Sequence, residues 1–154
     1  MELQSIAAIL LIISALSIFL LLQTRKETSR LEMLDAAGKP VFVDAELADT
    51  AAKRMKGLMF RERLAESEGM LFVFGDEDYR KFWMMNTTIP LDAIFFASDG
   101  TVVEIIQMEP CASLISCKTY QSSARARYVL EVNRGFAKEN GIEAGKSRGI
   151  GFPG

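Results

Sequence analysis

The chain has 154 residues, of which 49% are hydrophobic and 25% charged, and its formal net charge is -2 at pH 7. These values are typical of one folded domain of ordinary size. The sequence contains no histidine, which excludes Ser-His-Asp and Cys-His catalysis and most catalytic zinc sites. A nucleic-acid-binding domain needs a clustered basic excess, which is missing here. We therefore predict no cofactor, no metal site and no nucleic-acid partner.

An apolar run from Leu3 to Leu22 opens the chain, and as a helix it would span about 30 Å, the thickness of a bilayer core. A cleaved signal peptide is the main alternative. Against it, the run exceeds the usual apolar core of about 7–15 residues, no basic residue precedes it, and residues 23–26 form no small-residue cleavage site. We predict that residues 1–23 are a single-pass transmembrane anchor, with the lipid bilayer as the partner of residues 3–22.

Two signals disagree about the orientation of this anchor. Arg25, Lys26 and Arg30 follow the apolar run, and the positive-inside rule then favours a cytoplasmic domain. Cys111 and Cys117 lie close together in the sequence, which suggests a disulfide in an oxidising compartment, although two reduced thiols remain an alternative. We favour the disulfide and an extracytoplasmic domain.

Residues 24–39 are predicted to be a charged stem that continues as a helix until Gly38, and residues 40–154 a single domain. Val41–Leu47 alternates between apolar and polar residues, as a first strand does. A short helix then follows Asp49, which can cap it. Its expected buried stripe consists of Ala51, Met55, Leu58 and Met59.

Further strands are expected along the rest of the domain. Met70–Phe74 is apolar on both faces, and Lys81–Thr87 follows it after an acidic turn. Residues 91–97 and 101–108 form a hairpin around Ser98-Asp99-Gly100. Residues 128–133 form the last long strand, after which Asn133 can cap a helix over residues 135–140. Short strands with regular turn signals and two small helices predict an all-β domain, a jelly-roll-like β-sandwich or barrel, rather than alternating βαβ units.

The order of several segments resembles a known family. RMKGLMFRERL, EGMLFVF and FWMMNTTIPLD are followed by the hairpin through SDG, a Pro-Cys with a second Cys before Tyr120, and YVLEVNRGFAKENGI. This succession resembles the domain of unknown function 192 family over about residues 40 to 152. The resemblance implies a compact β-sandwich of jelly-roll-like character, often behind a signal or membrane segment, with no established biochemical activity.

Two positions depart from that family's pattern. The family commonly has a basic residue where this chain has Met85, and an acidic residue where it has Lys146. If the family's site uses that basic group for an anionic ligand, this chain lacks it. The positions that match the pattern are Arg54, Gly57-Leu58-Met59, Arg61, Asn86, Thr87, Asp92, Tyr120, Glu131 and Asn133.

Strand alternation suggests where a site could lie. Along residues 82–87 it places Phe82, Met84 and Asn86 on one face and Trp83, Met85 and Thr87 on the other, so one face can be core while the other lines a groove. In the last strand, Glu131 is a carboxylate among apolar residues. A half-buried carboxylate needs a partner, which Arg54, Arg61 or Arg127 could supply.

Three function classes follow. The preferred one is a membrane-anchored module that binds a small molecule, glycan or peptide. The second is a hydrolase that uses Asp92 and Glu131 as an acid/base pair. The third is a thiol or soft-metal role for Cys111 and Cys117, since thiolates suit Cu(I). A structural network without any ligand, in an interaction protein, is a further alternative. We assign no catalytic residue, and the predicted binding residues are Arg54, Arg61, Trp83, Met85, Asn86, Thr87, Asp92, Tyr120 and Glu131.

Overall fold

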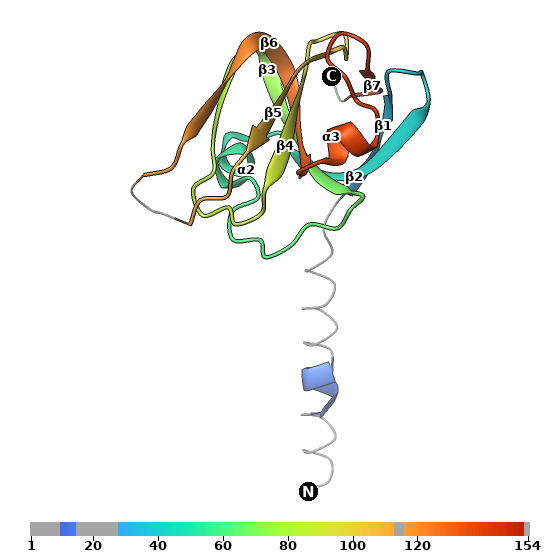
Figure 1. Ribbon diagram of the computed structural model, residues 1–154. Helices are drawn as coiled ribbons and strands as arrows, with labels where there is room; N and C mark the ends of the chain where they lie inside the picture. Colours follow the sequence, from blue (N-terminus) through green and yellow to red (C-terminus); the bar gives the residue numbers. More distant parts are fainter. Residues whose placement is uncertain (1–9, 15–27, 113–115, 153–154) are drawn as a thin grey trace, which may run out of the picture.

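The computed structural model describes residues 10–14, 28–112 and 116–152. Beyond a helical segment at residues 10–14, the chain forms the predicted mainly-β domain (Figure 1). Its elements are β1 (Thr28–Leu34), β2 (Pro40–Ala48), α2 (Ala51–Lys56), β3 (Glu68–Trp83), β4 (Leu91–Phe96), β5 (Val102–Met108), β6 (Thr119–Asn133), α3 (Phe136–Glu139) and β7 (Arg148–Ile150).

The seven strands among the described residues belong to one sheet in the order β5-β4-β6-β3-β2-β1-β7. The two edges of this sheet meet, because Thr101 forms an antiparallel bridge with Arg148. Beside this bridge, the Gly149 amide donates to the Gly100 carbonyl at 2.8 Å. The strands therefore form a single sheet curled on itself, closer to the barrel alternative than to two stacked sheets.

One neighbouring pair in this sheet is parallel. β2 and β3 pair from Asp44↔Glu68 to Ala48↔Phe72, while the other strand pairs are antiparallel. A parallel pair needs a long connection, and residues 49–67, including α2, provide it. The fold thus contains one βαβ unit, which the sequence analysis did not expect.

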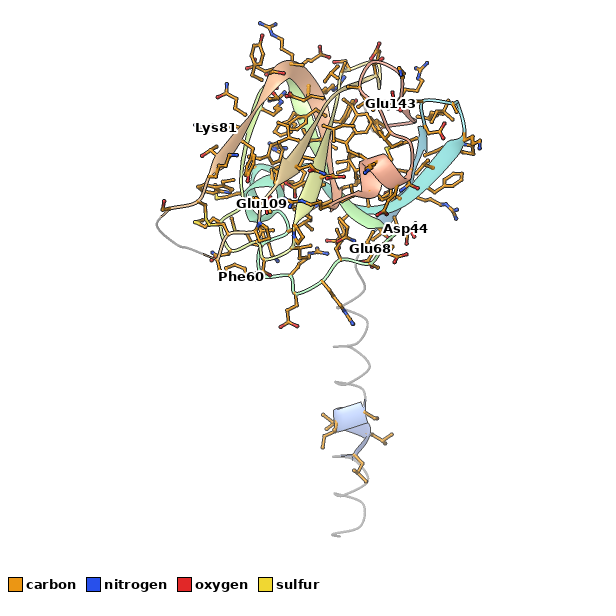
Figure 2. All side chains as sticks on the ribbon, in the orientation of Figure 1. Asp44, Phe60, Glu68, Lys81, Glu109 and Glu143 are labelled. Carbon is orange, nitrogen blue, oxygen red and sulfur yellow. A yellow bond between two sulfur atoms is a disulfide. The ribbon has the colours of Figure 1, made fainter. Side chains whose placement is uncertain are left out.

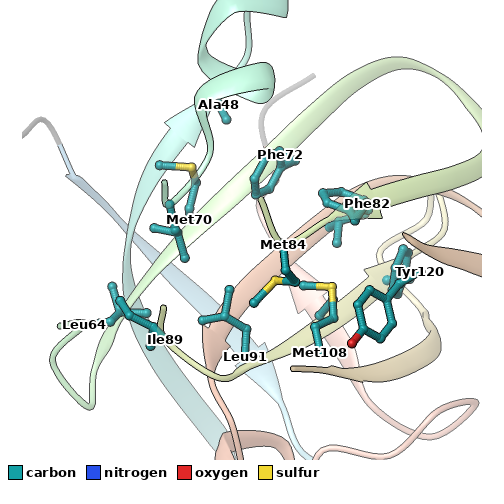
Figure 3. Close-up of a cluster of buried hydrophobic side chains, with 14 of the residues drawn as sticks. Ala48, Leu64, Met70, Phe72, Phe82, Met84, Ile89, Leu91, Met108 and Tyr120 are labelled. Carbon is teal, nitrogen blue, oxygen red and sulfur yellow. The ribbon is translucent and has the colours of Figure 1, made fainter. Parts of the chain in front are cut away.

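The two faces of the sheet carry separate hydrophobic clusters. The inner cluster draws on six strands and α3, with Met33, Val43, Ile94 and Leu130 among its fully buried members. The outer cluster lies on β3, β4 and β6 beneath α2 and the loops around residues 58–64 and 84–89. Figure 3 shows part of it, with Phe72, Phe82 and Met84 at its centre. The outer face is therefore covered by loops and one short helix rather than by a second sheet.

The segment expected to be a stem helix is a strand where the structure describes it. β1 pairs with β2 along its whole length, from Thr28↔Glu46 to Leu34↔Pro40. Leu31 and Met33 are buried, so an alternating pattern outweighs the local helical preference. The sheet therefore begins at Thr28 rather than at residue 40.

The predicted membrane span lies largely outside the described residues. Within residues 10–14, 28–112 and 116–152, no helix is both long and apolar enough to cross a membrane. The anchor stays a prediction.

β3 and β6 are longer than expected. Residues 75–78, predicted as an acidic turn, stay within β3, and the pairing with β6 shifts register between Val73 and Asp78. β3 ends at Trp83 instead of Thr87, and the chain turns at Asn86, which has a φ of 54°. β6 begins at Thr119 because it pairs with this extended β3, as in Trp83↔Thr119.

Both expected helix caps are wrong. Thr50, not Asp49, caps α2 by accepting a hydrogen bond from the Lys53 amide at 3.2 Å. Met55 is 67% exposed, so the expected buried stripe of this helix is absent apart from Leu58 beyond its end. At α3, the Asp92 carboxylate accepts from the Gly135 and Ala137 amides at 3.0 and 3.1 Å, where Asn133 had been expected.

Cys111 and Cys117 form a disulfide, as predicted. The chain has two cysteines, so this bond consumes both thiols. A site for Cu(I) built on free thiolates is therefore excluded in this state.

Candidate functional site

Glu131 lies in the middle of β6 on the face that carries the outer cluster. Its neighbours across the sheet are Met70 of β3 and Ala93 of β4. The residue is only 4% exposed, and among the described residues its carboxyl has no hydrogen bond or ion pair. Burial raises the pKa of Glu131 to about 8, because a low-dielectric environment disfavours the charged form. At pH 7 this carboxyl is mostly protonated.

The three arginines expected to pair with Glu131 have other partners. Arg54 donates to the carbonyl of Asp49 at 2.8 Å and to that of Val73 at 2.9 Å. Arg61 forms an ion pair with Glu46. Arg127 lies over the ring of Tyr128, 5.4 Å from its centroid. The predicted Glu131–arginine pair is therefore not formed.

Glu131 instead faces a narrow opening between α2 and β3, which we call the Glu131 slot. Its volume is about 20 Å³, and a cavity of roughly 10–15 Å³ already holds one water molecule. Only a group of about that size can reach the carboxyl. The slot is lined by Arg54, Met55, Lys56, Gly57, Leu58, Met59, Phe72, Phe82, Trp83, Thr87 and Glu131.

The wall opposite the sheet depends on the end of α2. Gly57 turns the chain there with a φ of 47°, and a Cβ at this position would lie 3.4 Å from the Phe72 ring. The guanidinium of Arg54 ties the helix to the carbonyl of Val73 in β3. Residues 64 and 65 are held by the Asn133 side chain, which donates to both of their carbonyls. Hydrogen bonds from side chains to backbone carbonyls thus hold α2 and the following loop over the sheet.

A larger hollow of about 300 Å³, the basic basin, adjoins the slot and shares Lys56 and Gly57 with it. Its lining is Glu46, Leu47, Lys53, Lys56, Gly57, Arg61 and Met70. Lys53 pairs with Asp49 at 2.8 Å, whereas Lys56 has no ion pair among the described residues. The Nη1 of Arg61 is buried without a hydrogen-bond partner. The side chains that line the basin therefore carry more positive than negative charge.

On its other side the slot adjoins a hollow of about 280 Å³, the Trp83 hollow, with which it shares Phe82 and Trp83. Lys81 and Thr119 complete its lining. Trp83 is 50% exposed, so its ring offers a flat apolar surface. The slot thus has the basin on one side and the Trp83 hollow on the other, and shares two lining residues with each.

Two residues with unusual backbone conformations join the loops that border this surface. Phe60 and Asn86 have φ values of 62° and 54°, and the Phe60 amide donates to the Asn86 carbonyl at 2.8 Å. The Phe60 side chain is 74% exposed and stands at the surface (Figure 2). A positive φ in a bulky residue is uncommon and costs of order 1–3 kcal/mol. The tertiary contacts between the two loops hold this conformation.

Four predicted binding residues meet at the slot: Arg54, Trp83, Thr87 and Glu131. Arg61 lies next to them in the basin. Met85 and Asn86 are half-buried nearby but line none of these three hollows. Lys146 pairs with Glu143 at 2.6 Å.

Two further predicted binding residues are structural. The hydroxyl of Tyr120 accepts from the Glu109 amide at 2.8 Å, within the outer cluster. Asp92 caps α3, and it lies opposite Val132 whereas Glu131 lies opposite Ala93. Because successive side chains alternate between faces, Asp92 and Glu131 point to opposite sides of the sheet. They cannot act as the acid/base pair of a hydrolase.

Met55, Lys56 and Phe72 line the slot but were not predicted as site residues. Met55 was assigned to the core, although the Lys53 and Lys56 around it are the usual sign of an exposed turn. Phe72 belongs to an apolar run, which gives no sign of a neighbouring opening. A parallel crossover brings these residues to β6, and no local pattern predicts that.

Two other hollows are larger than the slot, but the polar groups named below in each are already bonded. One of about 410 Å³ includes Asp92, whose oxygens accept from two backbone amides and from Gln107. The other, of about 360 Å³, lies beside Asp99 and Arg148, where the Arg148 guanidinium donates to the Asp99 carbonyl. Glu131 therefore makes the slot the stronger candidate.

Comparison with known proteins gives a family and two similar structures. The comparison with curated proteins found no match. A crystal structure of a proposed transcription regulator from Sinorhizobium meliloti 1021 is 34% identical, with a TM-score of 0.71, covering 82% of this chain and 96% of that one. A protein of unknown function from Novosphingobium aromaticivorans DSM 12444 is 32% identical, with a TM-score of 0.71, covering 80% and 85%. The model of the DUF192 family, described as an uncharacterized ACR, matches residues 33–149. The chain belongs to the DUF192 family, the domain of unknown function 192.

Proposed function

We propose that this chain is a membrane-anchored binding module that holds a small molecule, glycan or peptide at the Glu131 slot and the two hollows beside it. The observation that carries the proposal is the Glu131 carboxyl, which is buried, faces an opening and has no protein partner among the described residues. Binding sites combine apolar walls with a few polar groups, and residues with strongly perturbed pKa values concentrate in them.

The slot has apolar walls and a few polar groups, as binding sites do. Phe72, Phe82 and Trp83 supply apolar walls, while Glu131 and Thr87 supply polar groups at the bottom. A buried polar group without a partner costs about 1–3 kcal/mol. A ligand that bonds to Glu131 would remove this cost, which favours binding.

The intrinsic fluorescence of Trp83 provides a test, since it is the only tryptophan of the chain and lines the slot. The full-length protein in detergent micelles would be titrated with sugars, nucleotides, organic acids and peptides. A ligand should change the Trp83 emission and raise the midpoint of thermal unfolding, because it binds the folded state.

Two variants locate any such response. Glu131→Leu should remove it, whereas Glu66→Gln, at an exposed position, should leave it intact. Thermal unfolding of both variants verifies that they are folded. A response that survives in a folded Glu131→Leu protein, or no response to any compound, would contradict the proposal and favour a structural or interaction protein without a ligand.

We further propose that residues 1–23 anchor the module in a membrane, with the domain on the extracytoplasmic side. The apolar run at residues 3–22 and the Cys111–Cys117 disulfide support this, because such bonds persist in oxidising compartments. The full chain should stay in the membrane fraction after a carbonate wash, and protease added to spheroplasts, which lack an outer barrier, should cleave the domain. Recovery in the soluble fraction would disprove anchoring, and protection from the protease would reverse the orientation.

A further inference from the structure

We infer that the ligand of this site is a small organic anion that places its charged oxygens against Lys56 and Arg61 in the basic basin and an uncharged hydroxyl or carbonyl oxygen in the Glu131 slot. The inference rests on the proposed binding function and specifies the ligand class.

The sizes of the hollows divide the ligand into two parts. The slot, at about 20 Å³, admits only one small group, whereas the adjoining basin holds about 300 Å³. Lys56 and Gly57 line both. A ligand whose body fills the basin can therefore reach Glu131 with a single oxygen that projects past Gly57.

The charges around the basin and slot favour an anion. Arg54, Lys53, Lys56 and Arg61 line the two spaces, and Glu46 and Glu131 are the acidic residues that do so. Asp49 and Glu46 offset Lys53 and Arg61, which leaves Lys56 without an ion pair among the described residues. A ligand cation entering the slot would meet Arg54 and Lys56, whereas an anion would neutralise Lys56.

Two groups beside the basin and the slot lack a hydrogen-bond partner among the described residues, and at pH 7 both are hydrogen-bond donors. The Nη1 of Arg61 is a buried donor without an acceptor. Burial raises the pKa of Glu131 to about 8, so its carboxyl also carries a proton to donate. Arg54 and Lys56 of α2 are the charged side chains that line the slot with it, and the β3 side chains there are apolar. Ligand oxygens can accept from the Glu131 carboxyl and from Lys56, while the positive charge of Arg61, whose side chain is 18% exposed, attracts the anion.

Three sugars with the same ring and different charge test the ligand class. D-glucuronate, D-glucose and D-glucosamine would be titrated into the full-length protein in micelles at pH 6.5, with Trp83 fluorescence as the readout. D-glucuronate should bind at least tenfold more tightly than the neutral and cationic sugars. D-glucose 6-phosphate, as a fourth probe, distinguishes a phosphate from a carboxylate as the preferred anion.

Matched variants test the residues. Lys56→Gln should weaken D-glucuronate binding about tenfold, and Lys138→Gln, an exposed lysine on α3, should not. Between pH 6.5 and pH 9 the wild-type protein should lose about tenfold in affinity, because ionised Glu131 can no longer donate and repels the anion. Glu131→Gln keeps a donor that cannot ionise, so it should bind at pH 6.5 and lose less at pH 9.

Several outcomes would overturn the inference. D-glucose or D-glucosamine could bind as tightly as D-glucuronate, the two lysine variants could behave alike, or neither anion could bind. If any other compound then gave a Glu131-dependent response, the binding function would stand and only the anionic class would fall. If no compound gave a response that depends on Glu131, both the anionic ligand class and the binding function would be overturned.

Discussion

At the scale of single residues, Glu131 couples protonation to folding. Its pKa is raised from the ordinary value of 4.5 to about 8 by burial. Between these two values the folded chain binds the proton more tightly than the unfolded chain does. The free energy of unfolding therefore falls as pH rises through this window, and the contribution of Glu131 is fully present only below about pH 4.5.

Glu131→Gln should flatten this dependence, because an amide does not ionise. The wild-type protein should lose on the order of 1 kcal/mol for each pH unit within the window from this group, and the variant should not. Urea unfolding followed by circular dichroism at pH 5, 6, 7 and 8 would measure the difference. If the free energy of unfolding changed with pH in the same way in both proteins, Glu131 would not have a pKa raised by burial.

At the scale of elements, local signals predicted some strands well and others poorly. β2 and the β4–β5 hairpin were predicted because their alternation and the Ser98-Asp99-Gly100 turn are encoded in neighbouring residues. The second half of β3 and the first half of β6 are polar. They stabilise each other only by pairing, as in Lys81↔Gln121. Such strands depend on residues about 40 positions away, which a local pattern does not contain.

The site was predicted in the same partial way. Glu131 was recognisable as a carboxylate within an apolar strand, and Trp83 as an exposed neighbour of Phe82. The lack of an arginine partner for Glu131 was not predictable, because it depends on α2 placing Arg54 against the carbonyls of Asp49 and Val73. Asp92 was predicted as a binding residue because it matches the family pattern. Its role as the cap of α3 was not predictable, since it depends on a contact with residues 135 and 137.

The position of β1 predicts the minimal folded unit. A chain that begins at Arg25 should fold, and one that begins at Leu34 should be strongly destabilised. The shorter chain lacks the burial of Leu31 and Met33, each worth about 1.5–3 kcal/mol, and its β2 has an unpaired edge. Thermal unfolding of the two truncated proteins would compare them, and equal midpoints would contradict a structural role for β1.

At the scale of the whole molecule, the fold depends on the seam between its first and last edges. Gly100 and Gly149 make this seam, and their backbones are so close that a Cβ on Gly100 would lie 2.5 Å from the Gly149 carbonyl oxygen. Gly100 also has a φ of 85°, which favours glycine. Both the turn and the closure of the sheet therefore require glycine at position 100.

Gly100→Ala should lower the free energy of unfolding by about 2 kcal/mol, through backbone strain and displacement of β7. Gly75→Ala is the matched control, because a Cβ there meets no atom within 4 Å and its φ is not in the left-handed region. Urea unfolding would compare the two variants. Similar losses in both would indicate that the seam contributes little.

The pairing of β1 with β7 also bears on how the protein is made. Glu32 lies opposite Ile150 and Leu34 opposite Arg148, so the ribosome synthesises more than 110 residues between these partners. The sheet cannot close until the last strand has emerged from the exit tunnel. Until then, β1 presents a free edge to the chaperones and nascent chains around it.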